Sequence, residues 1–354
     1  MKIIDLIKSF GIRFPLYYIL LRYAPDSFWN FLYKNRNISL GKRVINPRAQ
    51  GYLEMTSLIT PPVSEWKDVN KVREGFHKAR FLYSVSKTKV GFIKDFHIEK
   101  PDFNIPVRLY EPEKRDDLFS DTAVVFIHGG GLVVGTKEAY DGFCRQLSNA
   151  IRMPLFSIDY RLAPEYSLEQ IQSDTRFFWQ WLQDNCSQFG VLPERIGLCG
   201  ESAGASLSLD ICEFFSQNTN YLRPKSLALI YPPFLQPYET DSRKQVALIH
   251  SIVFNDTLKW FESLAIPNGI REEVILRNQR GDLSKFPPVF LLTCGFDPLR
   301  DEGEVLASFI KNAGVKIEYR EYRDMFHGFV LSPALFDETR TLANDISLFF
   351  HENM

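Results

Sequence analysis

A serine flanked by two glycines ends an apolar run in this chain. The stretch is LCGESAGASL, residues 198–207, with Ser202 between Gly200 and Gly204. The apolar run is typical of a buried strand and the residues that follow are typical of a packed helix, so Ser202 is predicted on a sharp strand-to-helix turn. In such a turn the glycines admit a strained backbone, and the hydroxyl projects above the sheet where it can act as a nucleophile.

A serine hydroxyl is a weak nucleophile at neutral pH, so it needs a base within hydrogen-bond reach. His327, in the segment EYRDMFHGFV, follows directly after the last predicted strand. We therefore expect it at the end of the sheet that also displays Ser202. The other histidines precede the parallel sheet, open a glycine loop, lie in an insertion or lie near the C-terminus: His77, His97, His128, His250 and His351. His327 is the predicted base.

The base in turn needs an acid to orient it, and the acid is expected between serine and histidine along the chain. The segment LLTCGFDPLRDEGE, residues 291–304, offers four acidic residues. Asp297 stands immediately after a predicted strand, where catalytic groups of open parallel sheets gather. Asp301, Glu302 and Glu304 fall in the first turn of a predicted helix, where acids commonly stabilise the helix dipole. Asp297 is the predicted orienting acid.

Ester or amide cleavage through a serine also requires N–H donors for the oxyanion of the tetrahedral intermediate. The segment HGGGLVVG, residues 128–135, closes a predicted strand with three successive glycines. A flexible loop is the alternative interpretation of this segment. Beside a nucleophile turn, however, the pattern predicts an oxyanion hole made by Gly130 and Gly131 together with Ala203, the residue after the nucleophile.

Apolar runs that alternate with helical patterns indicate a parallel sheet covered on both faces. Two alternating runs, residues 92–98 and 104–112, come first and predict an antiparallel pair. The strands that follow are predicted in residues 122–131, 153–161, 195–200, 226–234, 288–296 and 316–322, and the helices between and after them in residues 140–152, 174–185, 202–215, 301–314 and 334–350. Residues 235–284 interrupt the alternation, with a helix predicted in residues 256–265, and this insertion is interpreted as a lid.

The 354-residue chain is 45% hydrophobic and 24% charged, which is typical of a globular protein with a large core. Its formal net charge of -1 at pH 7 gives no electrostatic reason to expect a nucleic acid partner. The five cysteines are scattered among apolar residues, which favours buried thiols over a disulfide framework. There is no CxxC pair to indicate zinc, and we expect no metal site.

Five segments in this order resemble one known family. They are HGGG, DYRLAPE (residues 159–165), GESAG, DPLRDEG (residues 297–303) and HGF (residues 327–329). Together they are similar to the hormone-sensitive-lipase-like esterases of the α/β-hydrolase superfamily. The resemblance covers roughly residue 92 to the C-terminus, apart from the insertion. The chain differs from the usual family pattern at Glu201 and Ala205, and Leu132 stands where a bulky aromatic residue is frequent.

The resemblance implies an α/β fold of the α/β-hydrolase type, with a mostly parallel central sheet flanked by helices and a largely helical cap. It implies a cap built from residues 1–91 and 235–284, over a catalytic domain of residues 92–234 and 285–354. Serine esterase activity and no cofactor are also implied. The implied site has Ser202, Asp297 and His327 as catalytic triad and the glycine loop as oxyanion hole, in which the second and third glycines donate. Arg161, Glu165 and Asp174 are expected to support the loops beneath it.

The sequence therefore predicts a serine carboxylesterase or lipase that works through an acyl-serine intermediate. An amidase or deacetylase on the same triad is an open alternative, and a non-catalytic binding module on the same fold is another. The expected partner is a small-molecule ester with an apolar acyl or aromatic group, because the predicted cap is rich in aromatic residues. A homodimer is a further open possibility.

The first fifty residues hold nine basic side chains and two acidic ones. Their longest apolar run, residues 14–21, is too short to span a bilayer. A helix with Ile3, Ile4, Leu6, Ile7, Phe10 and Phe14 beside basic residues could pack as cap over Ser202 or lie in a membrane interface. We expect a cytoplasmic protein, with peripheral membrane association through the basic N-terminus as the alternative.

Overall fold

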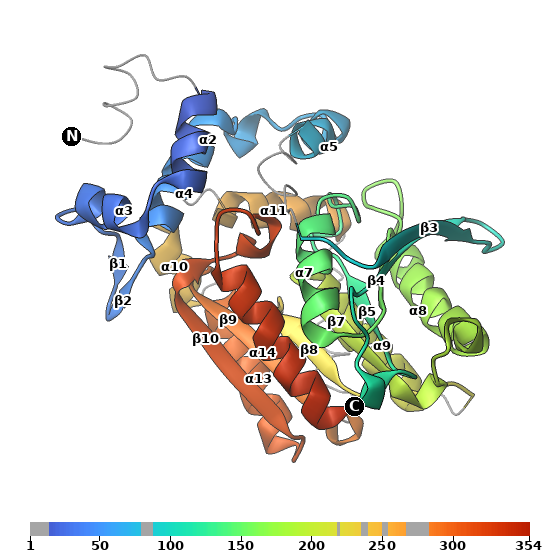
Figure 1. Ribbon diagram of the computed structural model, residues 1–354. Helices are drawn as coiled ribbons and strands as arrows, with labels where there is room; N and C mark the ends of the chain where they lie inside the picture. The colour runs from blue at the N-terminus through green and yellow to red at the C-terminus, as the bar shows by residue number, and fades with distance from the viewer. Residues whose placement is uncertain (1–13, 79–87, 218–219, 235–239, 250–253, 267–282) are drawn as a thin grey trace.

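The computed structural model describes most of the chain around a central sheet (Figure 1). The described residues are 14–78, 88–217, 220–234, 240–249, 254–266 and 283–354. The sheet strands are β3 (Phe92–Ile98), β4 (Ile105–Glu111), β5 (Ala123–Ile127), β6 (Leu155–Ile158), β7 (Ile196–Glu201), β8 (Leu227–Ile230), β9 (Val289–Phe296) and β10 (Ile317–Phe326). Their spatial order is β10-β9-β8-β7-β5-β6-β4-β3. All pairs from β10 to β6 are parallel, whereas β4 pairs antiparallel with both β6 and β3.

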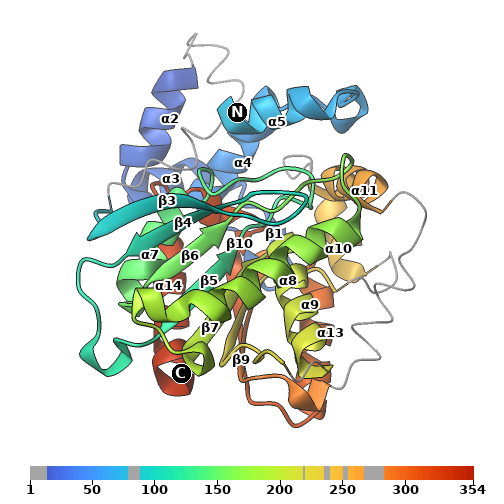
Figure 2. The same ribbon diagram turned by 90° about the vertical axis from the view of Figure 1, so that its right-hand side faces the viewer.

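Helices cover the sheet on both faces, as the apolar strands require. On one face lie α7 (Asp141–Ile151) and α14 (Glu338–Asn353), side by side (Figure 1). On the other lie α8 (Leu168–Asn185), α9 (Ala203–Gln217) and α13 (Arg300–Asn312); in Figure 2, α9 and α13 lie on the opposite side of the strands from α7 and α14. Every residue of β5, β6, β8 and β9 is buried, which explains why these strands have continuous rather than alternating apolar sequences.

The N-terminal helices lie together at the end of the molecule opposite the C-terminus (Figures 1 and 2). They are α2 (Phe14–Tyr23), α3 (Asp26–Tyr33), α4 (Pro47–Ile59) and α5 (Val69–Lys78), with a short hairpin of β1 (Ser39–Leu40) and β2 (Arg43–Val44) between α3 and α4. Two helices of the insertion are described, α10 (Asp241–Ala247) and α11 (Phe254–Ala265). The short 3-10 helices are η1 (Val63–Glu65), η2 (Asp117–Phe119), η3 (Cys186–Phe189), η4 (Pro193–Arg195), η5 (Leu283–Lys285) and η6 (Phe329–Leu331).

The fold agrees with the predicted alternation of strands and helices, but two helices begin elsewhere than predicted. The helix predicted in residues 174–185 is α8, which begins at Leu168 because Ser167 and Gln170 form a capping box there. The start of the last helix also differs. That helix begins at Glu338 rather than near residue 334, because residues 332–337 form turns that bury Leu335 and Phe336. The predicted apolar helix around Ile3 lies outside the described residues. Among the described helices, none is long and apolar enough to cross a membrane. All five cysteines are buried, as their apolar surroundings predict.

Candidate active site

Ser202 occupies the turn between β7 and α9 in a left-handed backbone conformation, with φ of 51°. This conformation is strained for a residue with a side chain, and it places Ser202 between the last strand residue and the first helical residue. Glycine is required at the two flanking positions because other backbone atoms approach them closely. A Cβ on Gly204 would lie 2.1 Å from the carbonyl oxygen of Ile127, and a Cβ on Gly200 would lie 2.4 Å from that of Gly204. Any larger residue at either position would push the turn away from the sheet.

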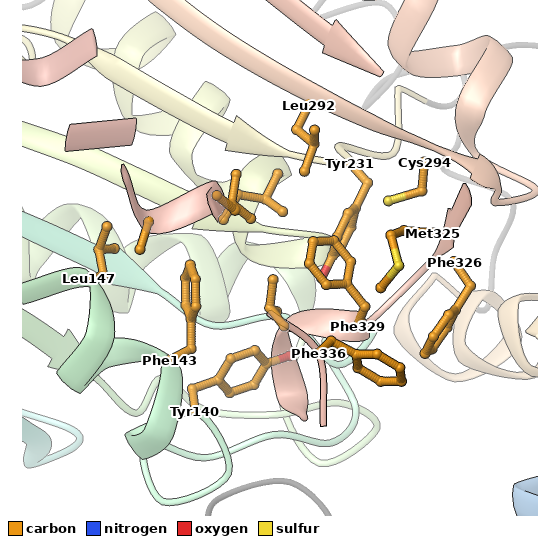
Figure 3. Packing of buried hydrophobic residues seen from close by; sticks show 14 of the residues in the cluster. Tyr140, Phe143, Leu147, Tyr231, Leu292, Cys294, Met325, Phe326, Phe329 and Phe336 are labelled. Atoms are coloured by element: carbon orange, nitrogen blue, oxygen red, sulfur yellow. The ribbon is translucent and has the colours of Figure 1, made fainter. Parts of the chain in front are cut away.

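His327 follows β10 and contacts both other residues of the predicted triad. Its Nε2 lies 2.9 Å from Ser202 Oγ, and its Nδ1 lies 2.8 Å from Asp297 Oδ2. A carboxylate can only accept a hydrogen bond, so the proton is assigned to Nδ1, which donates to Asp297. The unprotonated Nε2 can then accept a hydrogen bond from the serine hydroxyl. The ring packs against Tyr231 at a centroid distance of 4.3 Å. Tyr231 itself lies among buried aromatic residues, next to Phe329 (Figure 3).

Asp297 lies directly after β9 and is fully buried. One carboxylate oxygen faces His327 and the other accepts from the backbone N–H of Leu299 at 2.7 Å. The alternative acids have other partners. Glu302 is buried against the Arg243 guanidinium at 2.6 Å, and Asp301 accepts from the backbone N–H of Ser242 at 2.7 Å. The structure therefore brings Asp297, and neither of these alternatives, into hydrogen-bond contact with His327.

His128 belongs to the glycine loop rather than to the base position. Its ring is buried between two tyrosines, with the ring of Tyr160 stacked at 4.3 Å, and its Nδ1 lies 2.8 Å from the carbonyl oxygen of Gly129. Burial lowers the pKa of His128, so the neutral ring is favoured. His351 interacts with Ser347 near the C-terminus. His250, in the predicted insertion, lies outside the described residues.

The glycine loop has three consecutive residues in the left-handed region. Gly130 has a φ of 107°, Gly131 a φ of 62° and Leu132 a φ of 65°. Its conformation is held locally by the N–H groups of Val133 and Val134, which donate to the carbonyl oxygen of Gly130 at 3.1 and 2.9 Å. Successive backbone N–H groups in turn conformations can form a concavity that binds an anion.

Glu201 is a buried acid next to the nucleophile that the sequence analysis noted only as a departure from the family pattern. Tyr140 donates a hydrogen bond of 2.7 Å to its Oε2. Burial raises the pKa of Glu201, and the neighbouring His327 and two tyrosine hydroxyls oppose that rise. A Cβ on Gly129 would lie 1.9 Å from Oε2, so the first glycine of the loop is needed for Glu201 to approach. The position of Glu201 directly before Ser202 in GESAG is the sequence feature that could have identified it as part of the site.

Phe261 of α11 packs directly on the glycine loop. A Cβ on Gly131 would lie 2.2 Å from Cδ2 of the Phe261 ring. The neighbouring Trp260 packs edge-to-face on Trp66 at 5.1 Å, and its ring N–H donates to the Trp66 carbonyl oxygen at 3.1 Å. The insertion and the N-terminal region therefore contact each other beside Gly131.

The segment that contains Arg161 and Glu165 packs beneath the same loop. Arg161 is held by Asp174, which is fully buried and accepts at 2.7 Å from Nη2 and at 2.8 Å from Nε. Glu165 instead pairs with Arg73 of α5. Among the described residues, no group of three or more His, Cys, Asp or Glu side chains is arranged to hold a metal ion.

Comparison with known proteins places this geometry in a family. Residues 124–331 match a family described by its alpha/beta hydrolase fold. An ethyl acetate hydrolase from Pseudomonas putida is 25% identical over 282 residues, which cover 77% of this chain and 86% of that protein. The carboxylesterase NlhH of Mycobacterium tuberculosis is 29% identical over 268 residues, covering 73% of this chain and 83% of that protein.

One solved structure is similar to this chain over nearly the whole length of that structure. It is a hyperthermophilic esterase from the archaeon Pyrobaculum calidifontis, with a TM-score of 0.78 and 28% sequence identity. The similarity covers 87% of this chain and 98% of the esterase. The central sheet and its flanking helices are thus shared with an esterase of the same fold.

Proposed function

The chain belongs to the alpha/beta hydrolase fold family, and we propose that it hydrolyses carboxylic esters through an acyl-serine intermediate on Ser202. The observation that carries this proposal is the hydrogen-bonded series Ser202, His327 and Asp297, with distances of 2.9 and 2.8 Å. The two curated relatives described above, an ethyl acetate hydrolase and a carboxylesterase, support it.

In the acylation step Ser202 Oγ attacks the ester carbonyl carbon while His327 Nε2 accepts the hydroxyl proton. The carbonyl oxygen becomes an oxyanion, which accepts hydrogen bonds from backbone N–H groups that we assign to Gly130, Gly131 and Ala203. His327 then protonates the leaving alcohol as the carbon–oxygen bond breaks. Asp297 keeps the proton on Nδ1 and stabilises the imidazolium.

In the deacylation step water attacks the acyl-serine carbonyl carbon while His327 accepts a proton from the water. Collapse of the second tetrahedral intermediate breaks the bond to Ser202 Oγ, which takes the proton back from His327. The carboxylic acid leaves. His327 thus accepts and returns one proton in each of the two steps.

We assign the cap to residues 1–91 and 235–284 and the catalytic domain to residues 92–234 and 285–354. The pair Trp66 and Trp260 joins the two cap segments, and Phe261 packs on the loop that carries the oxyanion donors. Phe261 and the partly buried Leu132 are apolar, which suits an ester with an apolar acyl or aromatic group.

A panel of p-nitrophenyl esters of increasing acyl length tests both the activity and the substrate class. We expect hydrolysis that is lost in Ser202→Ala, with a preference that depends on acyl length. A parallel assay with p-nitroanilides tests the amidase or deacetylase alternative, which is favoured if the anilides turn over faster than the esters. Tight binding of esters without turnover would instead favour a binding module on this fold.

We also propose peripheral membrane contact through the N-terminal region. Three apolar side chains of α2 and α3 are largely exposed: Ile19 by 49%, Tyr23 by 68% and Phe31 by 81%. Basic residues accompany them, including Arg22, whose guanidinium lies 5.5 Å from the Tyr23 ring centroid. Exposed aromatic and basic residues on α2 and α3 suit the headgroup region of an anionic bilayer.

A further inference from the structure

Arg73 of α5 reaches from the N-terminal region to the glycine loop. Its Nε donates to the carbonyl oxygen of Val133 at 2.8 Å, and its Nη2 donates to that of Ala163 at 2.7 Å. Its Nη1 and Nη2 also donate to the two carboxylate oxygens of Glu165 at 2.8 and 2.7 Å. One side chain therefore connects α5 to the two segments that form the glycine loop and the turn beneath it.

The two carbonyl groups that Arg73 contacts help to fix the glycine loop, which we call the oxyanion loop because the assigned oxyanion donors Gly130 and Gly131 lie in it. Val133 stands two residues after Gly131, and its own N–H donates to the carbonyl oxygen of Gly130 at 3.1 Å. The N–H of Ala163 donates to the carbonyl oxygen of Leu132 at 2.8 Å. Arg73 thus donates to Val133 in the loop and to Ala163, whose own N–H donates to the loop residue Leu132.

The loop needs such support because its backbone is strained. Leu132 has a φ of 65°, a conformation that is unfavourable for a residue with a side chain and persists only when surrounding contacts impose it. The strained residue lies directly between Gly131 and Val133. If the contacts at Val133 and Ala163 are lost, the loop can relax and turn its N–H groups away from the oxyanion.

We propose that Arg73 is a positioning residue that fixes the oxyanion loop, so that docking of the cap helix α5 assembles the oxyanion hole. The proposal rests on the proposed ester hydrolysis. Arg73 does not touch the reacting atoms, and it acts through the backbone of residues 130–133. Catalysis thereby becomes dependent on the cap being in place.

The geometry calls for arginine rather than for any cation. A guanidinium presents donors in a rigid planar fork, and Arg73 uses them on two backbone carbonyls and one carboxylate. A lysine ammonium at this position could satisfy one of these acceptors well but has no fixed fork for the others. We therefore expect Arg73→Lys to rescue little of the loss caused by Arg73→Met.

Arg43 provides a matched control. Its side chain has the same 23% exposure as that of Arg73, and it also joins the N-terminal region to the catalytic domain, through Glu321 of β10. Its partners lie on β10 and α13 and not on the glycine loop. Arg43→Met should therefore remove a comparable ion pair without disturbing the oxyanion donors.

The first experiment compares kcat and KM for p-nitrophenyl acetate in the wild type, Arg73→Met, Arg73→Lys and Arg43→Met. We expect both Arg73 variants to lower kcat by about 10- to 100-fold with little change in KM, since misplacement of catalytic groups by about 1 Å can cost that much. Arg43→Met should stay within about threefold of the wild type. Equal kcat in Arg73→Met and Arg43→Met, with both variants folded, would overturn the proposal.

The second experiment measures inhibition by a trifluoromethyl ketone, which adds Ser202 Oγ at its carbonyl carbon and forms a hemiketal oxyanion. If Arg73 acts on the oxyanion hole, the inhibition constant should rise in Arg73→Met by the same factor as kcat/KM falls. An unchanged inhibition constant would overturn the proposal even if the variant is less active. A wild type that neither hydrolyses esters nor binds the ketone would instead refute the proposed function.

Discussion

The Ser202 hydroxyl is presented by a backbone conformation that few residues with side chains adopt. Its position on a strand-to-helix turn could be predicted because the flanking glycines, the strand before it and the helix after it are all evident in the local sequence. Asp297 and His327 could be predicted near Ser202 because each follows a strand of the same parallel sheet, and the carboxyl ends of parallel strands lie at one edge of the sheet. The structure places all three side chains in one hydrogen-bonded series.

Glu201 and Arg73 could not be assigned in the same way. Glu201 is recognisable in the sequence, but its burial against Tyr140 depends on how α7 packs on the sheet. Arg73 lies 60 residues before its partner Val133, and only the docking of α5 brings them together. Contacts between distant segments leave no local pattern, so residues that act through them escape sequence analysis.

The acid assignment can be tested by amide substitution. Asp297→Asn should lower kcat by about 10⁴-fold, because the amide favours the wrong tautomer of His327. Asp301→Asn should change kcat little, since Asp301 accepts from the backbone N–H of Ser242 instead. Steady-state hydrolysis of p-nitrophenyl acetate by both folded variants decides between them. The reverse ranking would mean that another acid orients the base.

Glu201 should make stability depend on pH. Burial raises its pKa above the ordinary value of 4.5 in the folded protein, so the folded state resists losing this proton more than the unfolded state does. The stability that Glu201 contributes is therefore complete below the unfolded pKa and is lost as the pH rises through the folded pKa.

Glu201→Gln removes this titration. Urea unfolding of the wild type and the variant across pH should show the wild type losing stability relative to the variant as the pH rises above about 4.5. A difference between the two proteins that is constant with pH, or that changes in the opposite direction, would contradict this account of Glu201.

Among the elements, the strands and helices of the catalytic domain could be predicted because each has one regular apolar pattern. Helix α4 of the N-terminal region was not predicted, since it contacts α2 and α3 and also places Tyr52 against Phe326 and Phe336. A helix that packs in several directions has no single apolar stripe. The start of α14 was predicted too early because the buried residues of the preceding turns resemble a helical pattern.

The glycine loop can be tested with Gly131→Val. A Cβ there would lie 2.2 Å from the Phe261 ring, so the branched side chain should displace the donors. Loss of one oxyanion donor costs about 100- to 1000-fold in kcat in a comparable hydrolase, and we expect a loss in that range. Labelling of Ser202 by a small organophosphonate should still occur.

Gly41 gives the matched control for backbone strain. Its φ of 60° is close to the 62° of Gly131, but no atom lies within 4 Å of the position of its Cβ. Gly41→Val should therefore carry a similar conformational penalty without touching the site. Turnover in Gly131→Val equal to that in Gly41→Val would assign the loop a role other than oxyanion binding.

At the scale of the whole molecule, the proposed membrane contact rests on the exposed side chains of α2 and α3. Phe31→Asp should reduce co-sedimentation with anionic vesicles, because it places a carboxylate where an aromatic ring is 81% exposed. Leu348→Asp is the control, since Leu348 is 62% exposed on α14 rather than on an N-terminal helix. Binding should weaken with salt. Equal recovery of all three proteins in the supernatant, with and without anionic lipid, would contradict membrane contact.

The central claim is that Ser202 carries the acyl group during turnover. The direct measurement is mass spectrometry of peptides from enzyme quenched in acid during hydrolysis of a p-nitrophenyl ester. We predict an added acyl mass on the peptide that contains Ser202, formed together with a burst of p-nitrophenol, and neither signal in Ser202→Ala. An acyl group on another residue, or undiminished turnover by folded Ser202→Ala, would contradict the account.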